Sequence, residues 1–286
     1  SMATPHVAGV AGLIATLYPE ASNEQIRTRI LANVDAVPSL QGKVATGGRL
    51  NALKALEQDE IAPDAPAGLE VTQEGAWLQV AWTNSGDDGQ QGQAYRYHLQ
   101  AGDSALVGKA TAAGTRQQVR IPAGVGANQV QVRLEDNVGN LGQAATLTKE
   151  TGLAQTELGW NSDGLWAQLP NGQWTDSPDG PYANRADSSL TSDWVQLPGQ
   201  ALLRFSHRHR LEASSDFVHL EIQKKGQDDW KSLEKFTSFR EHEDQNIDLS
   251  SFAGEVRFRF RLASDGAKVE DGYWLSPPRL LHPQLA

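Results

Sequence analysis

The 286-residue sequence contains no cysteine. A disulfide framework and a thiolate metal site are therefore excluded, and the redox state of the compartment cannot be inferred. No apolar run approaches the roughly 20 residues that span a bilayer, so we expect no membrane span, and no signal peptide opens the chain. Basic residues are also scarce, because 25 Lys and Arg stand against 35 Asp and Glu, a net charge of -10. Nucleic acids and anionic membranes select for basic surfaces, so we expect neither as a partner.

The residues that are present indicate a folded chain with more than one core. Hydrophobic residues make up 39% and charged residues 21% of the sequence, and eight tryptophans argue against wholesale disorder. The length exceeds what one hydrophobic core usually serves. Changes of periodicity along the chain predict three domains, residues 1–57, 68–151 and 152–286, with a linker at 58–67.

Residues 1–57 are predicted to form three helices and no strand. The stretch Ala8–Leu17 is apolar around its whole circumference, which indicates a fully buried helix. Ser22 and Gln25 predict a capping box at the start of a second helix, whose apolar stripe is Ile26, Ile30, Leu31 and Val34. A third helix, Arg49–Leu56, would bury Leu50, Leu53 and Leu56. Such a set cannot enclose the first helix, so a partner layer should be missing from this chain.

The same segment carries a family resemblance. Residues 1–9 read SMATPHVAG, which resembles the nucleophile motif of subtilisin-like serine proteases, whose usual form has Gly-Thr before the serine. The Tyr18-Pro19 pair, the Gln25-Ile26-Arg27 helix and the GRLNA run at residues 48–52 follow in the family's order. The last of these resembles the Gly-x-Asn-Ala element near the end of those catalytic domains. The resemblance covers Ser1 to about Glu57 and implies the last part of an α/β subtilase domain.

The resemblance implies that Ser1 is the catalytic nucleophile. A hydroxyl at a helix N-terminus lies beside unpaired backbone N–H groups, which favour both the attacking oxygen and the developing oxyanion. In the family, the histidine base, the aspartate that orients it and the oxyanion asparagine all precede the serine. None of them lies in this sequence, so we interpret it as a fragment or a mature product, inactive by itself. His6 would belong to the packing of the helix and not to catalysis.

Two other readings of Ser1 remain open at this point. A Ser-Met pair at a chain start can be left by removal of an expression tag. Alternatively, Ser1 could be an N-terminal nucleophile with its own α-amine as base. Such enzymes bury the terminus in a sheet sandwich, whereas the residues after Ser1 are predicted to be helical.

Beyond the linker, the hydrophobic period changes to two. Residues 58–67 are acidic and contain two prolines, as an extended linker should. Alternation at 78–82, 95–99 and 130–134, with turn-rich segments between, predicts an immunoglobulin-like or fibronectin type III-like sandwich at 68–151, with Trp82 in its core. The Asp136–Asn140 run (DNVGN) could bind calcium, but it is more typical of a tight turn.

Residues 152–286 are predicted to form a jelly roll of the kind appended to secreted bacterial proteases, which the order of their motifs resembles. Six of the tryptophans lie here: Trp160, Trp166, Trp174, Trp194, Trp230 and Trp274. Alternating apolar residues predict strands at 202–205, 218–222 and 256–262, and the last alternates with Arg257, Arg259 and Arg261.

Several features of this last domain could carry a function. Such jelly rolls often hold a structural calcium ion, and its oxygen ligands could come from Asp163, Asp176, Asp179, Asp187 and Asp271. His207 and His209 share a strand face and could ligate zinc, although two ligands do not make a site. The arginine ladder could contact an anionic glycan, but it is more simply the wet face of a sheet. Tryptophans could bind sugar rings, or they could form cores.

The sequence therefore predicts a serine-type endopeptidase of the bacterial extracellular space or cell envelope, with polypeptide substrates. The β domains would support or target the catalytic unit, for instance to a cell surface or glycan, or would assist its folding or secretion. No cofactor is expected for the chemistry, and calcium would be structural. The alternative is a non-enzymatic adhesion or carbohydrate-binding module behind a helical remnant.

Overall fold

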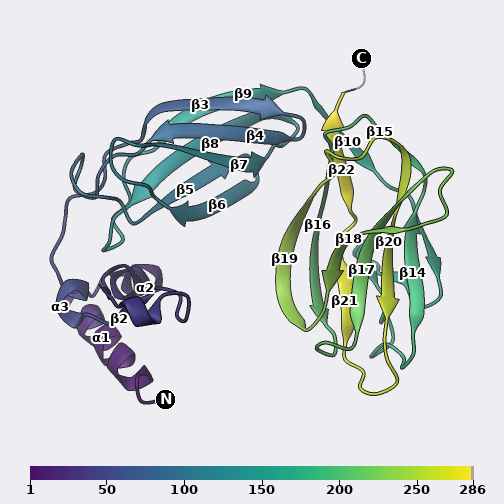
Figure 1. Ribbon diagram of the computed structural model, residues 1–286, viewed down its shortest axis with the longest axis horizontal. Helices are drawn as coiled ribbons and strands as arrows, with labels where there is room; N and C mark the ends of the chain where they lie inside the picture. Colours follow the sequence, from purple (N-terminus) through teal and green to yellow (C-terminus); the bar gives the residue numbers. More distant parts are fainter. Residues whose placement is uncertain (285–286) are drawn as a thin grey trace. The chain divides into compact units, whose positions relative to one another are not determined.

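The computed structural model describes residues 1–284, which form mostly β strands and few helices (Figure 1). Two compact units divide the chain. The first comprises Ser1–Thr72, Leu78–Ala123 and Ala127–Glu150, and the second comprises Gln73–Trp77, Gly124–Gly126 and the residues from Thr151 onward. No helix within residues 1–284 is long and apolar enough to cross a membrane.

The first unit begins with three helices: α1 (Thr4–Leu17), α2 (Asn23–Ala32) and α3 (Ala52–Ala55). The predicted capping box of α2 is confirmed. Gln25 N donates to Ser22 Oγ at 3.2 Å, and Ser22 N donates to Gln25 Oε1 at 2.9 Å, so two of the amides at the start of the helix are satisfied.

The segment between α2 and α3 corrects two predictions. A short antiparallel pair, β1 (Asp35–Ala36) and β2 (Gly48–Arg49), flanks a 3₁₀ turn at Pro38–Leu40, so the prediction of no strand is wrong. The backbone of residues 48–49 is thereby extended, and α3 is shorter than the predicted helix. A single turn cannot bury leucines spread over two turns, and Leu53 is 83% exposed.

The rest of the first unit is a sandwich of two sheets. One has the strand order β3 (Ala67–Glu74), β4 (Trp77–Thr83), β7 (Arg116–Pro122), and the other has the order β6 (Ser104–Lys109), β5 (Arg96–Ala101), β8 (Gly126–Glu135), β9 (Ala145–Thr151). The predicted alternation is confirmed in β4 and β8, where every second residue is buried. Trp82 lies in the core as predicted, and its indole Nε1 donates to Asn84 Oδ1 at 2.6 Å.

The second unit is a larger sandwich of two antiparallel sheets. In one sheet the order is β10 (Leu153–Glu157), β22 (Arg279–Pro283), β16 (Leu202–Arg210), β21 (Gly272–Leu275), β13 (Trp174–Thr175), β12 (Ala167–Gln168), with β19 (Phe239–Asp248) also paired to β16. The other has the order β11 (Trp160–Asp163), β14 (Asp187–Ser192), β20 (Gly254–Ala263), β17 (Phe217–Lys224), β18 (Lys231–Phe236), with β15 (Val195–Leu197) also paired to β20.

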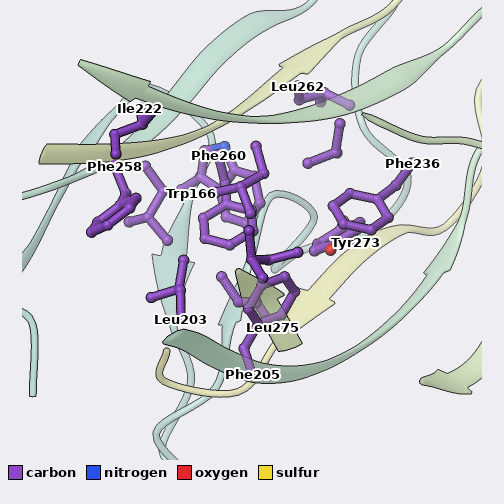
Figure 2. Packing of buried hydrophobic residues seen from close by; sticks show 14 of the residues in the cluster. Trp166, Leu203, Phe205, Ile222, Phe236, Phe258, Phe260, Leu262, Tyr273 and Leu275 are labelled. Carbon is purple, nitrogen blue, oxygen red and sulfur yellow. The ribbon is translucent and has the colours of Figure 1, made fainter. Parts of the chain in front are cut away.

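The core of the second unit lies between these two sheets (Figure 2). Apart from Leu202, the apolar residues of the predicted strands at 202–205, 218–222 and 256–262 belong to this core. Aromatic rings meet edge to face, as between Phe205 and Phe260, whose centroids lie 5.2 Å apart at 90°. The alternation of apolar residues in the sequence therefore predicted the strands of this core correctly.

One carboxyl group is buried in the second unit. Asp176, just after β13, is 1% exposed, and its Oδ1 accepts from Tyr273 N at 2.8 Å and from Ser177 Oγ at 2.9 Å. Its Oδ2 has no partner among the described residues. Burial raises the pKa of Asp176 to about 6, against an ordinary value near 4.

An Asp176→Asn variant is expected to be more stable than the parent at pH 8. Because the pKa of Asp176 is higher in the folded state than in the unfolded state, the free energy of unfolding falls as the pH rises from about 4 to about 6. The ionised carboxylate costs roughly 2–3 kcal/mol above that window. The amide keeps the acceptor for Tyr273 N, so we expect a gain of roughly 1–3 kcal/mol that vanishes near pH 4. Urea unfolding at several pH values measures it.

Asp271→Asn is the matched control, because Asp271 is exposed and pairs with Arg210. It should show no comparable pH dependence. A loss of stability in Asp176→Asn that is the same at pH 4 and pH 8 would contradict the prediction.

Candidate functional site

Ser1 lies at the N-terminal end of α1. It is exposed, and the first hydrogen bonds within the helix run from His6 N and Val7 N to Ala3 O, at 3.1 and 3.3 Å. No side chain caps this end within residues 1–284. The backbone amides that precede His6 are therefore left without helical acceptors, and they place the positive end of the helix dipole beside Ser1.

The outer surface of α1 is apolar and uncovered in this chain. Val10 and Ile14 are its buried residues, whereas Leu13 is 51% and Leu17 59% exposed. His6 is exposed as well. The prediction of a fully buried helix is therefore wrong for this chain, because the described residues hold no layer over the outer face of α1. That outcome agrees with the prediction that the partner layer is missing.

The inner side of α1 is held by the rest of the helical segment. Val10 and Ile14 pack with Ala55, and Ile26 and Ile30 of α2 lie against them. Tyr18, from the Tyr-Pro pair after α1, donates its hydroxyl to Leu56 O at 2.9 Å. The Arg29 guanidinium stacks on the Tyr18 ring at 4.0 Å and donates to Glu57 O at 2.8 Å. Residues from three parts of the resemblance thus form one small packed body.

The face of α2 that is most buried is polar, which the sequence analysis missed. Thr28, Arg29 and Asn33 are buried, while the predicted apolar stripe is only half-buried. Thr28 Oγ1 donates to Glu135 Oε1 at 2.9 Å, and Asn33 Nδ2 donates to Asn137 O at 2.6 Å. These bonds fasten α2 to the first sandwich.

Glu135 is the centre of this attachment. Its side chain is 5% exposed, and its oxygens accept from Arg96 Nε at 2.7 Å and from Arg96 Nη2 at 2.9 Å. His98 Nε2 lies against the same carboxylate, and Arg96 also pairs with Glu24 of α2 at 2.8 Å. Burial alone would raise the pKa of Glu135, but hydrogen bonds from His98, Arg96 and Thr28 lower it to about 2. The carboxylate is therefore ionised at neutral pH.

The Asp136–Asn140 segment next to this network forms the predicted turn. Asp136 Oδ1 accepts from Val138 N at 2.9 Å and from Asn140 N at 2.8 Å, and Oδ2 accepts from Asn140 Nδ2 at 2.8 Å. Gly139 has φ +94°, and an added Cβ would lie 2.9 Å from Gln25 Cγ. The turn therefore needs glycine there, and its carboxylate is occupied by N–H donors.

The five aspartates predicted as calcium ligands do not come together. Asp163 accepts from Ser189 N, Asp187 pairs with Arg261, and Asp271 pairs with Arg210. Asp179 is exposed, and Asp176 is buried as described above. Among residues 1–284, the three carboxylates that do converge are those of Glu212, Asp216 and Asp265. Asp216 already accepts from Tyr182 Oη at 2.5 Å and from Asp265 N at 2.8 Å. A structural calcium ion stays a prediction.

His207 and His209 are core residues. Both are buried, their rings stack at 5.3 Å, and each stacks on Tyr273. Burial lowers the pKa of His207 to about 3, which keeps the imidazole neutral. No group of three metal-ligating side chains within residues 1–284 contains either histidine, so the zinc hypothesis is not supported.

The arginine ladder lies on the outer face of the β20 sheet, as the wet-face interpretation predicts. Arg259 pairs with Glu221 at 2.6 Å and Arg261 pairs with Asp187 at 2.6 Å. Of the six tryptophans of this unit, Trp166 is buried, whereas Trp194 is 37% exposed. The tryptophans of this unit therefore lie both in the core and at the surface.

Comparison with known proteins concerns the N-terminal segment first. The sequence profile of the subtilase family matches residues 1–53. A thermostable alkaline protease of Halalkalibacterium halodurans is 57% identical over 44 residues, which are 15% of this chain. The match spans only 12% of that protein's length. Both matches support a subtilase origin for the segment that begins at Ser1.

Solved structures resemble the β units only distantly. A family 29 carbohydrate binding module is 16% identical to this chain, with a TM-score of 0.32. The match covers 46% of this chain and 88% of the module. The K3 cleaved adhesin domain of Lys-gingipain from Porphyromonas gingivalis W83 is 13% identical to this chain, with a TM-score of 0.30. The match covers 42% of this chain and 90% of the adhesin domain. Similarity at this level carries no inference about function.

Proposed function

We propose that residues 1–57 are the last part of the catalytic domain of a subtilisin-like serine endopeptidase, with Ser1 as the nucleophile. The observation that carries this proposal is the apolar helix α1. It follows a serine within the segment that matches the subtilase profile, and its outer face is uncovered. A helix of this kind is stable in water only when a further layer covers it, and the missing part of a catalytic domain would be that layer.

In the proposed reaction, the Ser1 hydroxyl attacks the scissile carbonyl while its proton passes to a histidine supplied by residues outside this sequence. The amides at the start of α1 stabilise the negative oxygen that develops. The amine leaves with the proton, and water then hydrolyses the acyl-enzyme. His6 is exposed on the helix and takes no part. This chain by itself should therefore be inactive.

The two β units would be accessory domains of a secreted or envelope protease that acts on polypeptides. Three strands facing four, in the orders β3-β4-β7 and β6-β5-β8-β9, support a fibronectin type III-like or immunoglobulin-like domain at 68–151. Two large antiparallel sheets support a jelly roll at 152–286. The bonds from α2 to Glu135 support a stabilising role for the first of them.

A fluorophosphonate probe tests the proposal. We expect it to label the complete gene product that contains this chain behind residues supplying the aspartate and histidine, and not to label this chain alone. The probe reacts only with an activated serine, so labelling reports the assembled site. Absence of labelling in a folded, fully processed gene product would overturn the enzyme proposal and favour the adhesion or carbohydrate-binding alternative.

A further inference from the structure

A hollow of about 440 Å³ lies on the outer face of the second unit, over the sheet β11-β14-β20-β17-β18. Trp194 and Trp230 line it together with Arg257 and Arg259 of β20. Asn161, Asp163 and Asp193 add amide and carboxylate groups to the wall. The hollow belongs to the second unit, and its argument does not depend on the protease proposal.

The two indole rings hold the Arg257 guanidinium between them. Its central carbon lies 4.7 Å from the Trp194 ring centroid and 5.2 Å from that of Trp230. The Arg259 guanidinium lies 4.1 Å from the Trp230 centroid. A guanidinium that stacks on a ring can still donate from its N–H groups in its own plane. Arg259 donates to Glu221 through both Nε and Nη2, whereas Arg257 donates to Gln223 through Nε alone.

The charges on this face are unequally compensated. Arg259 pairs with Glu221 and Arg261 pairs with Asp187, both at 2.6 Å. The side-chain partner of Arg257 is the neutral amide of Gln223, whose Oε1 accepts from Nε at 2.7 Å. No carboxylate within residues 1–284 forms an ion pair with Arg257. Two carboxylates, those of Asp163 and Asp193, also line the hollow and accept hydrogen bonds from Ser189 N and Asn161 Nδ2. Arg257 is therefore the guanidinium of the hollow that has no ion pair among the described residues.

We propose that this hollow binds a glycan that carries a carboxylate on its sugar ring, a uronic acid unit for example. The carboxylate would take the free edge of Arg257, which suits a planar bidentate anion. Indole faces pack against the apolar C–H face of a pyranose ring. The sugar hydroxyls would bind to the amide of Asn161, whose Nδ2 donates to Asp193 Oδ1 at 2.9 Å, and to the carboxylates of Asp163 and Asp193.

A sugar fits this place better than a peptide strand does. Peptides commonly bind sheets by pairing with a free edge strand. The hollow lies on the face of β11, β14 and β20, of which β14 and β20 are interior strands bonded on both sides and β11 is an edge strand. The side chains that line this face are aromatic, amide, carboxylate and guanidinium groups, which can hold a sugar without any strand pairing.

The test is a binding titration of the full chain with oligogalacturonate, using neutral galactose oligomers of equal length as the comparison. Tryptophan fluorescence and calorimetry would measure the dissociation constants. We expect saturable binding of the acidic oligomer, weakened at high salt, and at least about tenfold weaker binding of the neutral one. Arg257→Gln should remove that difference, and Trp194→Ala should weaken binding of both oligomers. Arg261→Gln is the matched control and should change neither, since Arg261 is already paired.

Three results would overturn the proposal. The first is no saturable binding of the acidic oligomer by folded chain, with circular dichroism confirming the fold. The second is equal affinity for acidic and neutral oligomers. The third is an acidic peptide that binds more tightly than the oligomer and depends equally on Arg257. Arg257→Lys is a second variant that separates loss of the charge from misfolding. It keeps the positive charge and should therefore retain part of the preference for the acidic oligomer.

Discussion

Replacement of Ser1 by alanine is expected to lower peptide hydrolysis by roughly 10⁴- to 10⁶-fold in the complete gene product. The Ser1 hydroxyl supplies the atom that would form the acyl-enzyme. Removal of the nucleophile leaves only the oxyanion stabilisation and substrate binding, which account for the residual rate. Hydrolysis of a chromogenic peptide measures the effect.

Ser22→Ala is the matched control for that experiment. Ser22 caps α2 and lies outside the proposed chemistry, so its loss should cost about 1 kcal/mol of stability and little activity. If Ser1→Ala retained more than a tenth of the parent's activity while folding normally, Ser1 would not be the nucleophile. The N-terminal amine hypothesis is separable, because it requires Ser1 to be the free N-terminus of the active protein, which N-terminal sequencing of the active species would show.

Glu135→Gln is expected to destabilise the first unit by roughly 3 kcal/mol at pH 7. The substitution removes the charge that holds Arg96, whose side chain is only 14% exposed, and it weakens the bonds to Thr28 and His98. Arg96 would keep its contact with Glu24 of α2, which limits the loss. Thermal or urea unfolding of the full chain measures the change in the first unit's transition.

The pH dependence gives this prediction a second readout. The folded-state pKa of about 2 lies below the ordinary value near 4.3, so Glu135 contributes stability that is present above about pH 4.3 and is lost as the pH falls toward 2. The difference between parent and variant should shrink over that window. Glu70→Gln is the control, since Glu70 is 69% exposed and its pair with Arg116 should contribute at most about 1 kcal/mol. Equal effects of the two variants would contradict the role of Glu135.

The sequence by itself determined the local features. The capping box at Ser22, the alternation that buries Trp82, and the core strands of the second unit all follow from spacings of two to four residues. Such spacings are set by the geometry of a single helix or strand, so they can be read without knowing the neighbours. The subtilase resemblance of the first 57 residues is likewise a property of contiguous sequence.

Only the tertiary structure decided which polar groups meet. Thr28 and Glu135 are 107 positions apart, and no periodicity predicts that the polar face of α2 is the one that is buried. The same holds for the second unit, where Asp176 is buried and Arg257 lacks an acid while Arg259 has one. The free energy of a charged or polar group depends on its burial and its partners, and both are set by the packing of distant segments. The alternation of hydrophobic residues therefore predicted where the core strands lie, whereas the packing of distant segments determined the charge state and partners of the polar side chains.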